Sequence, residues 1–154
     1  MSPQIQAWLT RHQIAHRLHE HAALKSFDDL SAALNFPPQA MVKALVFVDP
    51  AGRCILAAMP GPARADYKRI ADAAGCSRAQ LRPATPDELR GILDAEAGGV
   101  APVAVNGSLL LIDAGVTGLD RIYCGTGRVG STLEMAAADW LGAAGGIVGD
   151  FAKG

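Results

Sequence analysis

Lys43 is the only charged residue in segment 40–48, which reads Ala-Met-Val-Lys-Ala-Leu-Val-Phe-Val. The β-branched and aromatic residues of this segment, and the Asp-Pro-Ala-Gly turn sequence after it, predict a β-strand. Alternation along a strand puts Lys43, Leu45 and Phe47 on one face and the apolar residues between them on the other. An unpaired buried ammonium is costly, so either Lys43 reaches a cavity or an anion, or its stem packs and its head meets water. The strand alone leaves both interpretations open.

A glycine-rich loop is expected at residues 125–130, Gly-Thr-Gly-Arg-Val-Gly, which match the dinucleotide-binding pattern GxGxxG. A Rossmann unit needs a helix directly after these glycines and then a parallel strand. Residues 131–135 look extended instead, and only 24 residues follow Gly130. We therefore expect no nicotinamide cofactor, and no other cofactor. The glycines either let backbone amides approach a ligand or form a hairpin turn.

A second backbone-dominated loop is expected at residues 98–102, Gly-Gly-Val-Ala-Pro. Such a loop can present successive amides as a cradle for an oxyanion or a carboxylate, with proline fixing its exit. A plain surface turn would have the same composition. The loop gains a functional meaning only if it lies beside Lys43.

Three histidines, His16, His19 and His21, lie within six residues, on a segment that we expect to be a short strand. Strand spacing would put His19 and His21 on one face as a pair of metal ligands. No cysteine or carboxylate stands at the spacing of a third ligand, so we predict no metal site.

The cysteines, Cys54, Cys76 and Cys124, are odd in number and widely spaced. This usage is typical of reduced, buried thiols in a cytosol rather than of a disulfide framework. No signal peptide is evident, and the apolar stretch 136–151 is too short and too interrupted to span a membrane. We therefore expect a cytoplasmic protein that is not bound to a membrane.

The composition limits the class of partner. The chain has 154 residues, 50% of them hydrophobic, with 14 Lys and Arg against 15 Asp and Glu. These numbers allow one core, and we expect one domain over residues 1–154. A net charge of −1 gives no global field that would attract nucleic acid, so any polyanion contact must be a local patch. Candidates for such a patch are Arg64, Lys68, Arg69 and Arg128.

Periodicity and capping residues predict the elements that position these groups. Helices are expected after Ser2, Ser26, Asp66 and Thr85, the last of these running to about residue 95, and also over residues 136–144. Strands are expected at residues 16–21, 40–48, 53–59, 109–113, 119–124 and 131–135, with a hairpin between the second and third. This mixture predicts an α/β fold of the α+β type, a single domain with a mixed, largely antiparallel β-sheet flanked by helices.

The order and spacing of these segments resemble the YbaK/ProX family of trans-editing aminoacyl-tRNA deacylases, which are related to the insertion domain of bacterial prolyl-tRNA synthetase. The resemblance runs from residue 16 to residue 141. It is carried first by the histidine-rich strand before Ser26, by Lys43 in its apolar strand, and by Ala-Thr-Pro-Asp-Glu-Leu at 84–89. It continues through the loop 98–102, Ile-Tyr-Cys-Gly-Thr-Gly at 122–127 and Leu-Glu-Met-Ala-Ala-Ala-Asp-Trp-Leu at 133–141.

This resemblance implies hydrolysis of the ester that joins a wrong amino acid to tRNA, above all prolyl tRNA that carries cysteine, alanine or another small residue. Lys43 would supply a fixed positive charge, and the amides of Gly99, Val100 and Ala101 would hold the ester oxygen as it becomes negative. The base would be the ribose hydroxyl of the substrate or the thiol of a cysteine substrate, so neither a triad nor a metal is implied. The same resemblance assigns substrate binding to His21, Ser26, Gly98, Pro102, Tyr123, Gly125, Gly127 and Arg128.

The expected partners follow from the same resemblance. Aminoacylated tRNA would be the substrate, but a near-neutral protein would bind it weakly, because affinity for nucleic acid rests on phosphate contacts. Prolyl-tRNA synthetase is therefore expected to assist by binding the tRNA beside this protein.

Three positions depart from the family pattern. Ala44 stands where alanine-directed members carry Asn, Asp94 where Gly is frequent, and Ala104 where another small residue is common. These changes predict a reshaped pocket. They also keep open a non-catalytic module that binds an aminoacyl group or a nucleotide, or that regulates a synthetase. Hydrolysis of some other small ester or amide is a third alternative.

Overall fold

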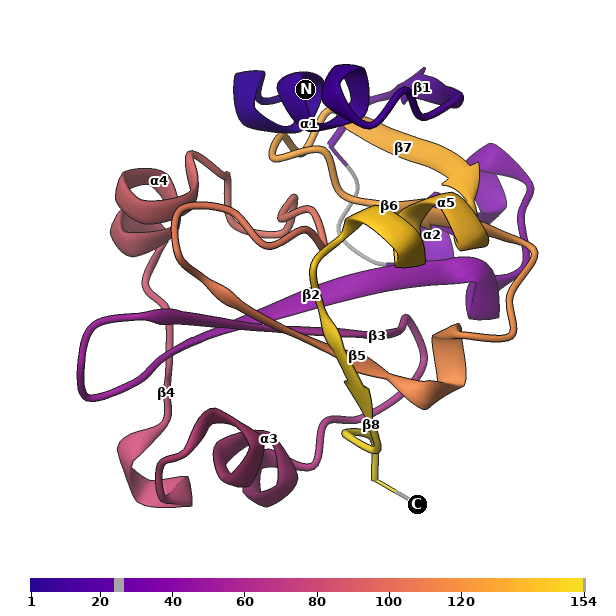
Figure 1. The fold of residues 1–154 in the computed structure, drawn as a ribbon. Helices are drawn as coiled ribbons and strands as arrows, with labels where there is room; N and C mark the ends of the chain where they lie inside the picture. Colours follow the sequence, from indigo (N-terminus) through magenta and orange to yellow (C-terminus); the bar gives the residue numbers. More distant parts are fainter. Residues whose placement is uncertain (24–26, 154) are drawn as a thin grey trace.

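The computed structural model describes residues 1–23 and 27–153. Ser26, which the sequence assigns to substrate binding and to a helix cap, lies outside these residues. In the described part of the chain, one eight-stranded sheet carries helices on both of its faces (Figure 1). No helix of that part is long and apolar enough to cross a membrane.

The sheet is mixed. Its order is β1-β7-β6-β2-β3-β5-β8, with the short β4 paired to β2 beside this path. Neighbouring strands are antiparallel except in the pairs β2 with β6, β3 with β5 and β5 with β8. This confirms the predicted fold class. The strands are β1 (His16–Glu20), β2 (Met41–Val48), β3 (Cys54–Pro60), β4 (Arg82–Pro83), β5 (Leu109–Asp113), β6 (Arg121–Cys124), β7 (Ser131–Ala136) and β8 (Ile147–Gly149).

The five predicted helices are present, and three short 3-10 turns accompany them in the described residues. The helices are α1 (Pro3–Arg11), α2 (Phe27–Leu34), α3 (Tyr67–Ala74), α4 (Pro86–Leu93) and α5 (Ala137–Ala143), and the turns are η1 (Pro38–Ala40), η2 (Arg78–Gln80) and η3 (Ala114–Val116). Strands β4 and β8 are not predicted, because two or three residues are too few to show an alternating pattern.

Capping residues fix the helix ends that lead into the site. The Asp66 side chain accepts a hydrogen bond from an amide of the first turn of α3. At α4, Thr85 and Glu88 form a reciprocal capping box, as the sequence predicts. Asp94 ends α4 in the left-handed conformation, with φ 49°, two residues earlier than the sequence predicts for the end of the helix. At α1, by contrast, the Ser2 side chain makes no capping hydrogen bond.

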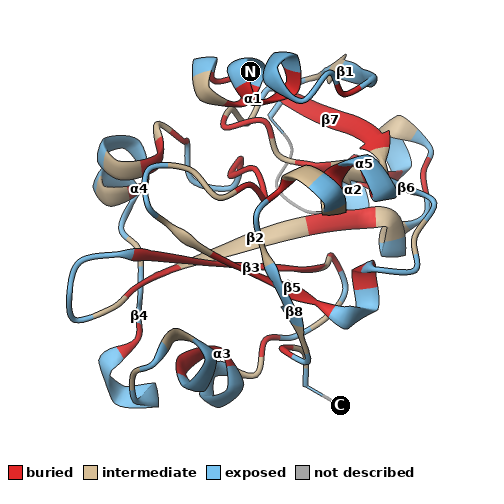
Figure 2. Ribbon diagram, viewed as in Figure 1, coloured by how far each residue is buried: buried red, intermediate tan, exposed pale blue. Residues whose placement is uncertain are grey.

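The core lies on both sides of the central strand β3, which is buried from Cys54 to Met59 (Figure 2). One apolar layer contains Leu56 and residues of α1, α4 and α5. The opposite layer contains Ile55 and residues of α3. Each large side chain buried in this way contributes roughly 1.5–3 kcal/mol. The sheet is therefore a well-packed platform, and the candidate site lies at a gap beside its interior strand β2.

Candidate active site

Strand β2 has a continuous neighbour on one edge and an interrupted one on the other. β3 pairs with it along nearly its whole length. On the opposite edge, β6 pairs only at Met41 and Val42, and β4 pairs only at Phe47 and Val48. These two neighbours lie toward opposite ends of β2 (Figure 1). Residues 43–46 lie between the two pairings and are half-buried, so this edge is open at the middle of the strand.

Backbone direction determines which groups face this gap. The Gly61 amide donates to the Met41 carbonyl on the β3 side at 2.7 Å, and the Ala84 amide donates to the Val46 carbonyl on the β4 side at 3.0 Å. Successive residues of a strand direct their amides and carbonyls to alternate edges. The amide and carbonyl of Ala44 therefore face the gap and give it a polar backbone rim.

A cavity of about 260 Å³ occupies this gap. Its lining comes from residues 41–46 of β2, from Ala84 and Leu89 beside and in α4, and from Gly98, Val100 and Gly125 in the two glycine loops. Most of its walls are aliphatic, and Lys43 is the ionisable member of this lining. Pockets for drug-sized ligands hold roughly 300–1,000 Å³, so this space suits a small group rather than a whole nucleotide.

Lys43 projects from the face of β2 that the sequence predicts. Leu45 and Phe47 pack with the α3 layer, whereas Ala44 and Val46 pack with the opposite layer. The Lys43 ammonium donates a hydrogen bond to the carbonyl of Ala63, in the loop after β3. Burial lowers the pKa of Lys43 below its ordinary value. Lys43 thus lines the cavity, and a backbone carbonyl of the protein holds its ammonium.

The loop 98–102 presents fewer amides than the sequence predicts. The Gly99 amide donates to the Glu96 carbonyl at 2.9 Å, so it is already used within the protein. In the described part of the chain, the amides of Val100 and Ala101 have no hydrogen-bond acceptor, although both residues are buried. Buried amides are rarely left without a partner. Val100 lines the cavity, so its amide is the best placed donor for a ligand oxygen.

Glycines are required where the two loops cross. A β-carbon on Gly125 would lie 2.4 Å from the Val100 carbonyl oxygen, and one on Gly99 would lie 2.8 Å from the carbonyl carbon of Arg128. The Gly127 amide also donates to the Gly99 carbonyl at 2.6 Å. Residues 125–130 join the antiparallel strands β6 and β7, so the hairpin interpretation of this loop is confirmed. Its glycines serve close packing of the loops and place Gly125 at the cavity.

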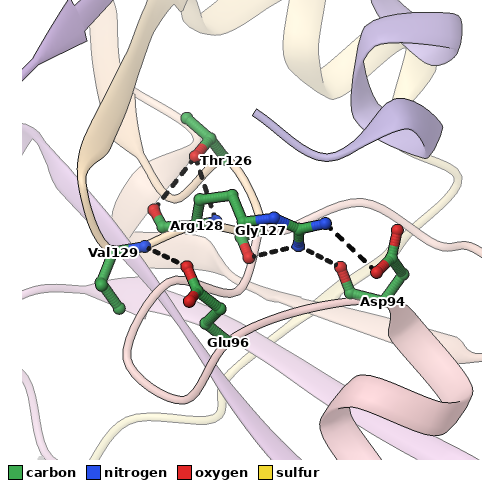
Figure 3. Close-up of polar contacts among 6 residues, drawn as sticks. All are labelled: Asp94, Glu96, Thr126, Gly127, Arg128 and Val129. Carbon is green, nitrogen blue, oxygen red and sulfur yellow. Dashed lines mark hydrogen bonds and ion pairs between the residues drawn. The ribbon is translucent and has the colours of Figure 1, made fainter.

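Arg128 fastens these loops together (Figure 3). Its guanidinium donates to the carbonyls of Asp94 at 2.6 Å and Gly127 at 2.9 Å, and to the Asp94 carboxylate at 3.2 Å. The Val129 amide donates to the Glu96 carboxylate at 3.0 Å in the same region. Arg128 and Gly127 do not line the cavity. The structure thus gives Arg128 a role in holding the loops, whereas the sequence assigns it to substrate binding.

The three departures from the family pattern have different positions. Asp94 is the left-handed residue after α4, where glycine is common, and its carboxylate pairs with Arg128. The Ala104 amide donates to the Ala144 carbonyl at 3.1 Å, away from the cavity lining. Of the three, only Ala44 forms part of the cavity wall.

Three other predicted substrate-binding residues have partners within the protein and lie outside the cavity lining. His21 contacts the Thr132 hydroxyl at 2.8 Å and the Ala22 carbonyl at 2.7 Å through its two ring nitrogens. The Tyr123 ring stacks on Phe36, with centroids 4.0 Å apart. The Pro102 carbonyl accepts a hydrogen bond from the indole of Trp140.

No cysteine lines the cavity in the described residues. Burial raises the pKa of Cys124 to about 12, so its thiol stays protonated at neutral pH and is a poor nucleophile. Cys54 is also buried. Within residues 1–23 and 27–153, no three histidine, cysteine or carboxylate side chains are placed to hold a metal ion.

Residues missed by the sequence reasoning come from segments without a chemical signal. Ala63 offers only a carbonyl, and Ala84 and Leu89 offer only apolar walls. The proline-rich segment around Ala63 and the cap at Thr85 mark turns, but nothing in their composition indicates that they meet β2.

The fold and its cavity can now be set against known proteins. A family model described as the aminoacyl-tRNA editing domain matches residues 21–143, which include Lys43 and both glycine loops. The chain therefore belongs to the aminoacyl-tRNA editing domain family, and the resemblance drawn from the sequence is confirmed. No match is found among curated proteins.

Solved structures share the fold over the whole chain. One, provisionally assigned as a trans-editing enzyme for prolyl tRNA synthetase, is 25% identical with a TM-score of 0.85, covering 100% of this chain and 99% of that one. A hypothetical protein is 24% identical with a TM-score of 0.85, covering 97% of this chain and 99% of that one. A protein from Marinobacter aquaeolei VT8, provisionally assigned to signal transduction, is 16% identical with a TM-score of 0.69. There the match covers 100% of this chain but 31% of that one.

Proposed function

We propose that this protein is a trans-editing deacylase that hydrolyses the ester of a mischarged aminoacyl-tRNA. The observation that carries the proposal is that one small cavity is lined both by Lys43 and by Val100, whose amide has no acceptor in the described residues. Membership of the editing domain family supports the reaction class. The cavity supports the site, because it admits an aminoacyl group and excludes larger ones.

An aminoacyl ester is already activated toward hydrolysis, so the protein needs only to stabilise the developing negative charge and to orient the reacting groups. The amides of Val100 and Ala101 hold the carbonyl oxygen as it becomes negative, while Lys43 supplies positive charge at the ester end or the adjacent phosphate. Water adds to the carbonyl carbon, and the ester bond to the ribose oxygen breaks. That oxygen leaves with a proton, which the substrate's own ribose hydroxyl, or the thiol of a cysteine substrate, relays. The remaining role of the protein is orientation.

A small, uncharged amino acid side chain fits the walls best. Ala44, Val46 and Leu89 present methyl and methylene groups without a partner for a charged side chain. Cysteine, alanine and residues of similar size are therefore the proposed cargo, and prolyl tRNA is the proposed carrier. A similar solved structure is provisionally assigned as a trans-editing enzyme for prolyl tRNA synthetase, which supports prolyl tRNA as the carrier. Prolyl-tRNA synthetase is the proposed partner, since a net charge of −1 offers tRNA little attraction.

The test is a panel of deacylation reactions with the wild-type protein. Prolyl tRNA charged separately with cysteine, alanine, serine or proline is compared with the same amino acids as simple methyl esters. We expect rapid hydrolysis of the ester when the tRNA carries one or more of the small, wrong amino acids. We expect no hydrolysis when the tRNA carries proline. Faster hydrolysis of the simple esters would favour a different esterase. Tight binding of the charged tRNA without hydrolysis would favour the non-catalytic module.

A second measurement addresses the synthetase. Binding of prolyl tRNA is followed by gel shift with and without the cognate prolyl-tRNA synthetase. We expect weak binding by this protein alone and clear improvement when the synthetase is added. Equal binding in both reactions would remove the synthetase from the proposal.

A further inference from the structure

A charged cluster lies on the sheet at strands β1, β7 and β6, outside the cavity. Glu134 is 7% exposed. One of its carboxylate oxygens contacts His19 Nε2 at 2.8 Å, and the other accepts from Arg121 Nε at 2.7 Å. Arg17 stands directly opposite Glu134 in the β1–β7 register, so the two share a face of the sheet. We call Arg17, His19, Arg121 and Glu134 the β1–β7 cluster.

Arg121 is held in a way that leaves most of its hydrogen-bonding capacity unused. Its side chain is 43% exposed, and only Nε contacts the buried carboxylate. In the described residues, the two terminal nitrogens have no hydrogen-bond partner, so four of the five N–H donors are unused. A guanidinium fixed at one end presents a fork that matches the geometry of a phosphate.

The cluster carries net positive charge although it contains a glutamate. Two arginines outweigh one carboxylate. Arg17 is exposed. The chain as a whole has a net charge of −1, so the positive charge of the cluster is a local feature of one face of the protein.

The cluster and the Lys43 side chain lie on the same face of the sheet. Tyr123 pairs with Glu134 on one side and with Met41 on the other. The Met41 side chain belongs to the same apolar cluster as the Tyr123 ring, and Lys43 follows Met41 by two residues on that face. Two strand spacings across and two residues along β2 give a separation of about 12 Å between residues 134 and 43.

We infer that the β1–β7 cluster binds phosphates of the single-stranded 3′ end of the tRNA whose terminal ester lies at Lys43. The stacked rise of about 3.4 Å per nucleotide is a lower limit for a single strand, so 12 Å spans at most about four nucleotides. The contacted phosphates therefore lie within about four nucleotides of the terminal adenosine. Glu134 is a positioning residue, since it acts on the RNA only by holding Arg121 and His19. This inference rests on the proposed function.

The experiment compares substrates that contain or lack these phosphates. Wild type, Arg121→Gln and Arg17→Gln are assayed on mischarged tRNA and on the aminoacyl ester of adenosine alone. Arg11→Gln is the control, because Arg11 is exposed at the end of α1 and is not a member of the cluster. We expect kcat/KM on tRNA to fall about tenfold for Arg121→Gln and less for Arg17→Gln, with the adenosine ester unchanged. Each cluster substitution is also expected to reduce the slope of log affinity against log salt by about 0.7.

Other outcomes overturn the inference. Equal losses on both substrates would mean that Arg121 supports the fold or the cavity, and no loss on tRNA would mean that the RNA runs elsewhere. Arg17→Gln keeps the test valid if Arg121→Gln misfolds. Arg17 is exposed on an edge strand, so its substitution should not disturb the fold.

A binding assay separates this inference from the proposed function. The binding of an uncharged 3′-terminal tetranucleotide is measured by fluorescence anisotropy for the same four proteins. If wild type hydrolyses neither substrate, the deacylase proposal fails. Weaker binding by the cluster variants would then still support the phosphate site, and unchanged binding would refute it.

Discussion

Gly125 lies so close to Val100 that a β-carbon on residue 125 would stand 2.4 Å from the Val100 carbonyl oxygen. This contact brings the hairpin loop between β6 and β7 against the loop 98–102, and both loops then reach the cavity. The position of the Val100 amide, and hence the proposed oxyanion site, depends on that contact.

Gly125→Ala is expected to damage both the fold and the activity. The new methyl group would meet backbone atoms, which cannot rotate away, so we expect a loss of about 1–3 kcal/mol in the free energy of unfolding. Deacylation should fall more than stability explains, because the Val100 amide moves. Gly118→Ala is the matched control, since a β-carbon there meets nothing within 4 Å. Urea unfolding and deacylation rates measure the two effects, and a fully active Gly125→Ala would contradict this account of the loop contact.

Lys43→Met is expected to separate activity from stability. Burial lowers the pKa of Lys43, so the unfolded chain binds this proton more tightly than the folded protein does. The charged lysine therefore costs stability at neutral pH, and that cost disappears as the pH rises from the folded pKa toward the ordinary value. We expect the Met variant to lose deacylation while its Tm at pH 7 stays level or rises. A clear drop in Tm would show that Lys43 has a structural role.

Lys43 also predicts a pH profile for the wild-type reaction. Its positive charge is lost as pH rises through a pKa that lies below the usual lysine range. After subtraction of the spontaneous hydrolysis rate, enzymatic deacylation should therefore decline on the alkaline side of the profile. The measurement is a single-turnover rate series across pH, and a corrected rate that continues to climb past the ordinary lysine pKa would count against the proposed role.

The hydrogen bonds that Arg128 makes to loop carbonyls are expected to contribute more to the stability of the fold than the negative charge of Asp94 does. Arg128→Ala removes hydrogen bonds to two carbonyls and should cost about 1–2 kcal/mol of stability. Asp94→Asn keeps a residue that tolerates the left-handed conformation and weakens only a partly exposed ion pair, so about 0.5 kcal/mol or less is expected. Chemical denaturation of both variants measures the two losses of stability. A larger loss for Asp94→Asn than for Arg128→Ala would contradict the proposed role of Arg128 in holding the loops together.

Cys124→Ala is expected to leave the reaction intact. The thiol has a pKa raised to about 12 and is fully buried, so it is protonated during catalysis. We expect an unchanged deacylation rate with some loss of stability from the smaller side chain. Resistance of the wild-type rate to thiol-alkylating reagents is the companion measurement. A collapse of activity in the alanine variant would require a new mechanism.

Several elements that position the candidate site can be predicted from the sequence. A single lysine in an apolar strand makes Lys43 a candidate, and Thr85 with Glu88 predicts the start of α4, because capping and alternation act between near neighbours. The order of these segments also identifies the family, which the match over residues 21–143 confirms.

What the sequence does not reveal depends on contacts between distant segments. That β4 stops short of Lys43 is a matter of strand register, which no local pattern determines. The use of the Gly99 amide by Glu96, and of Arg128 by Asp94, follows from how two loops cross. The sequence therefore predicts a glycine loop that does line the cavity, but not that some of its groups are already hydrogen-bonded within the protein.

The central claim is that the cavity at the open edge of β2 is where the ester is hydrolysed. The most direct measurement is single-turnover hydrolysis of mischarged prolyl tRNA by wild type, Lys43→Ala and Lys153→Ala. Lys153 is the control because it is an exposed lysine outside the cavity lining. Removing a group that stabilises the developing charge typically costs about 100-fold to 1,000-fold in rate. We predict a loss of that size for Lys43→Ala and none for Lys153→Ala, and a Lys43→Ala protein that retains nearly the wild-type rate would contradict the account.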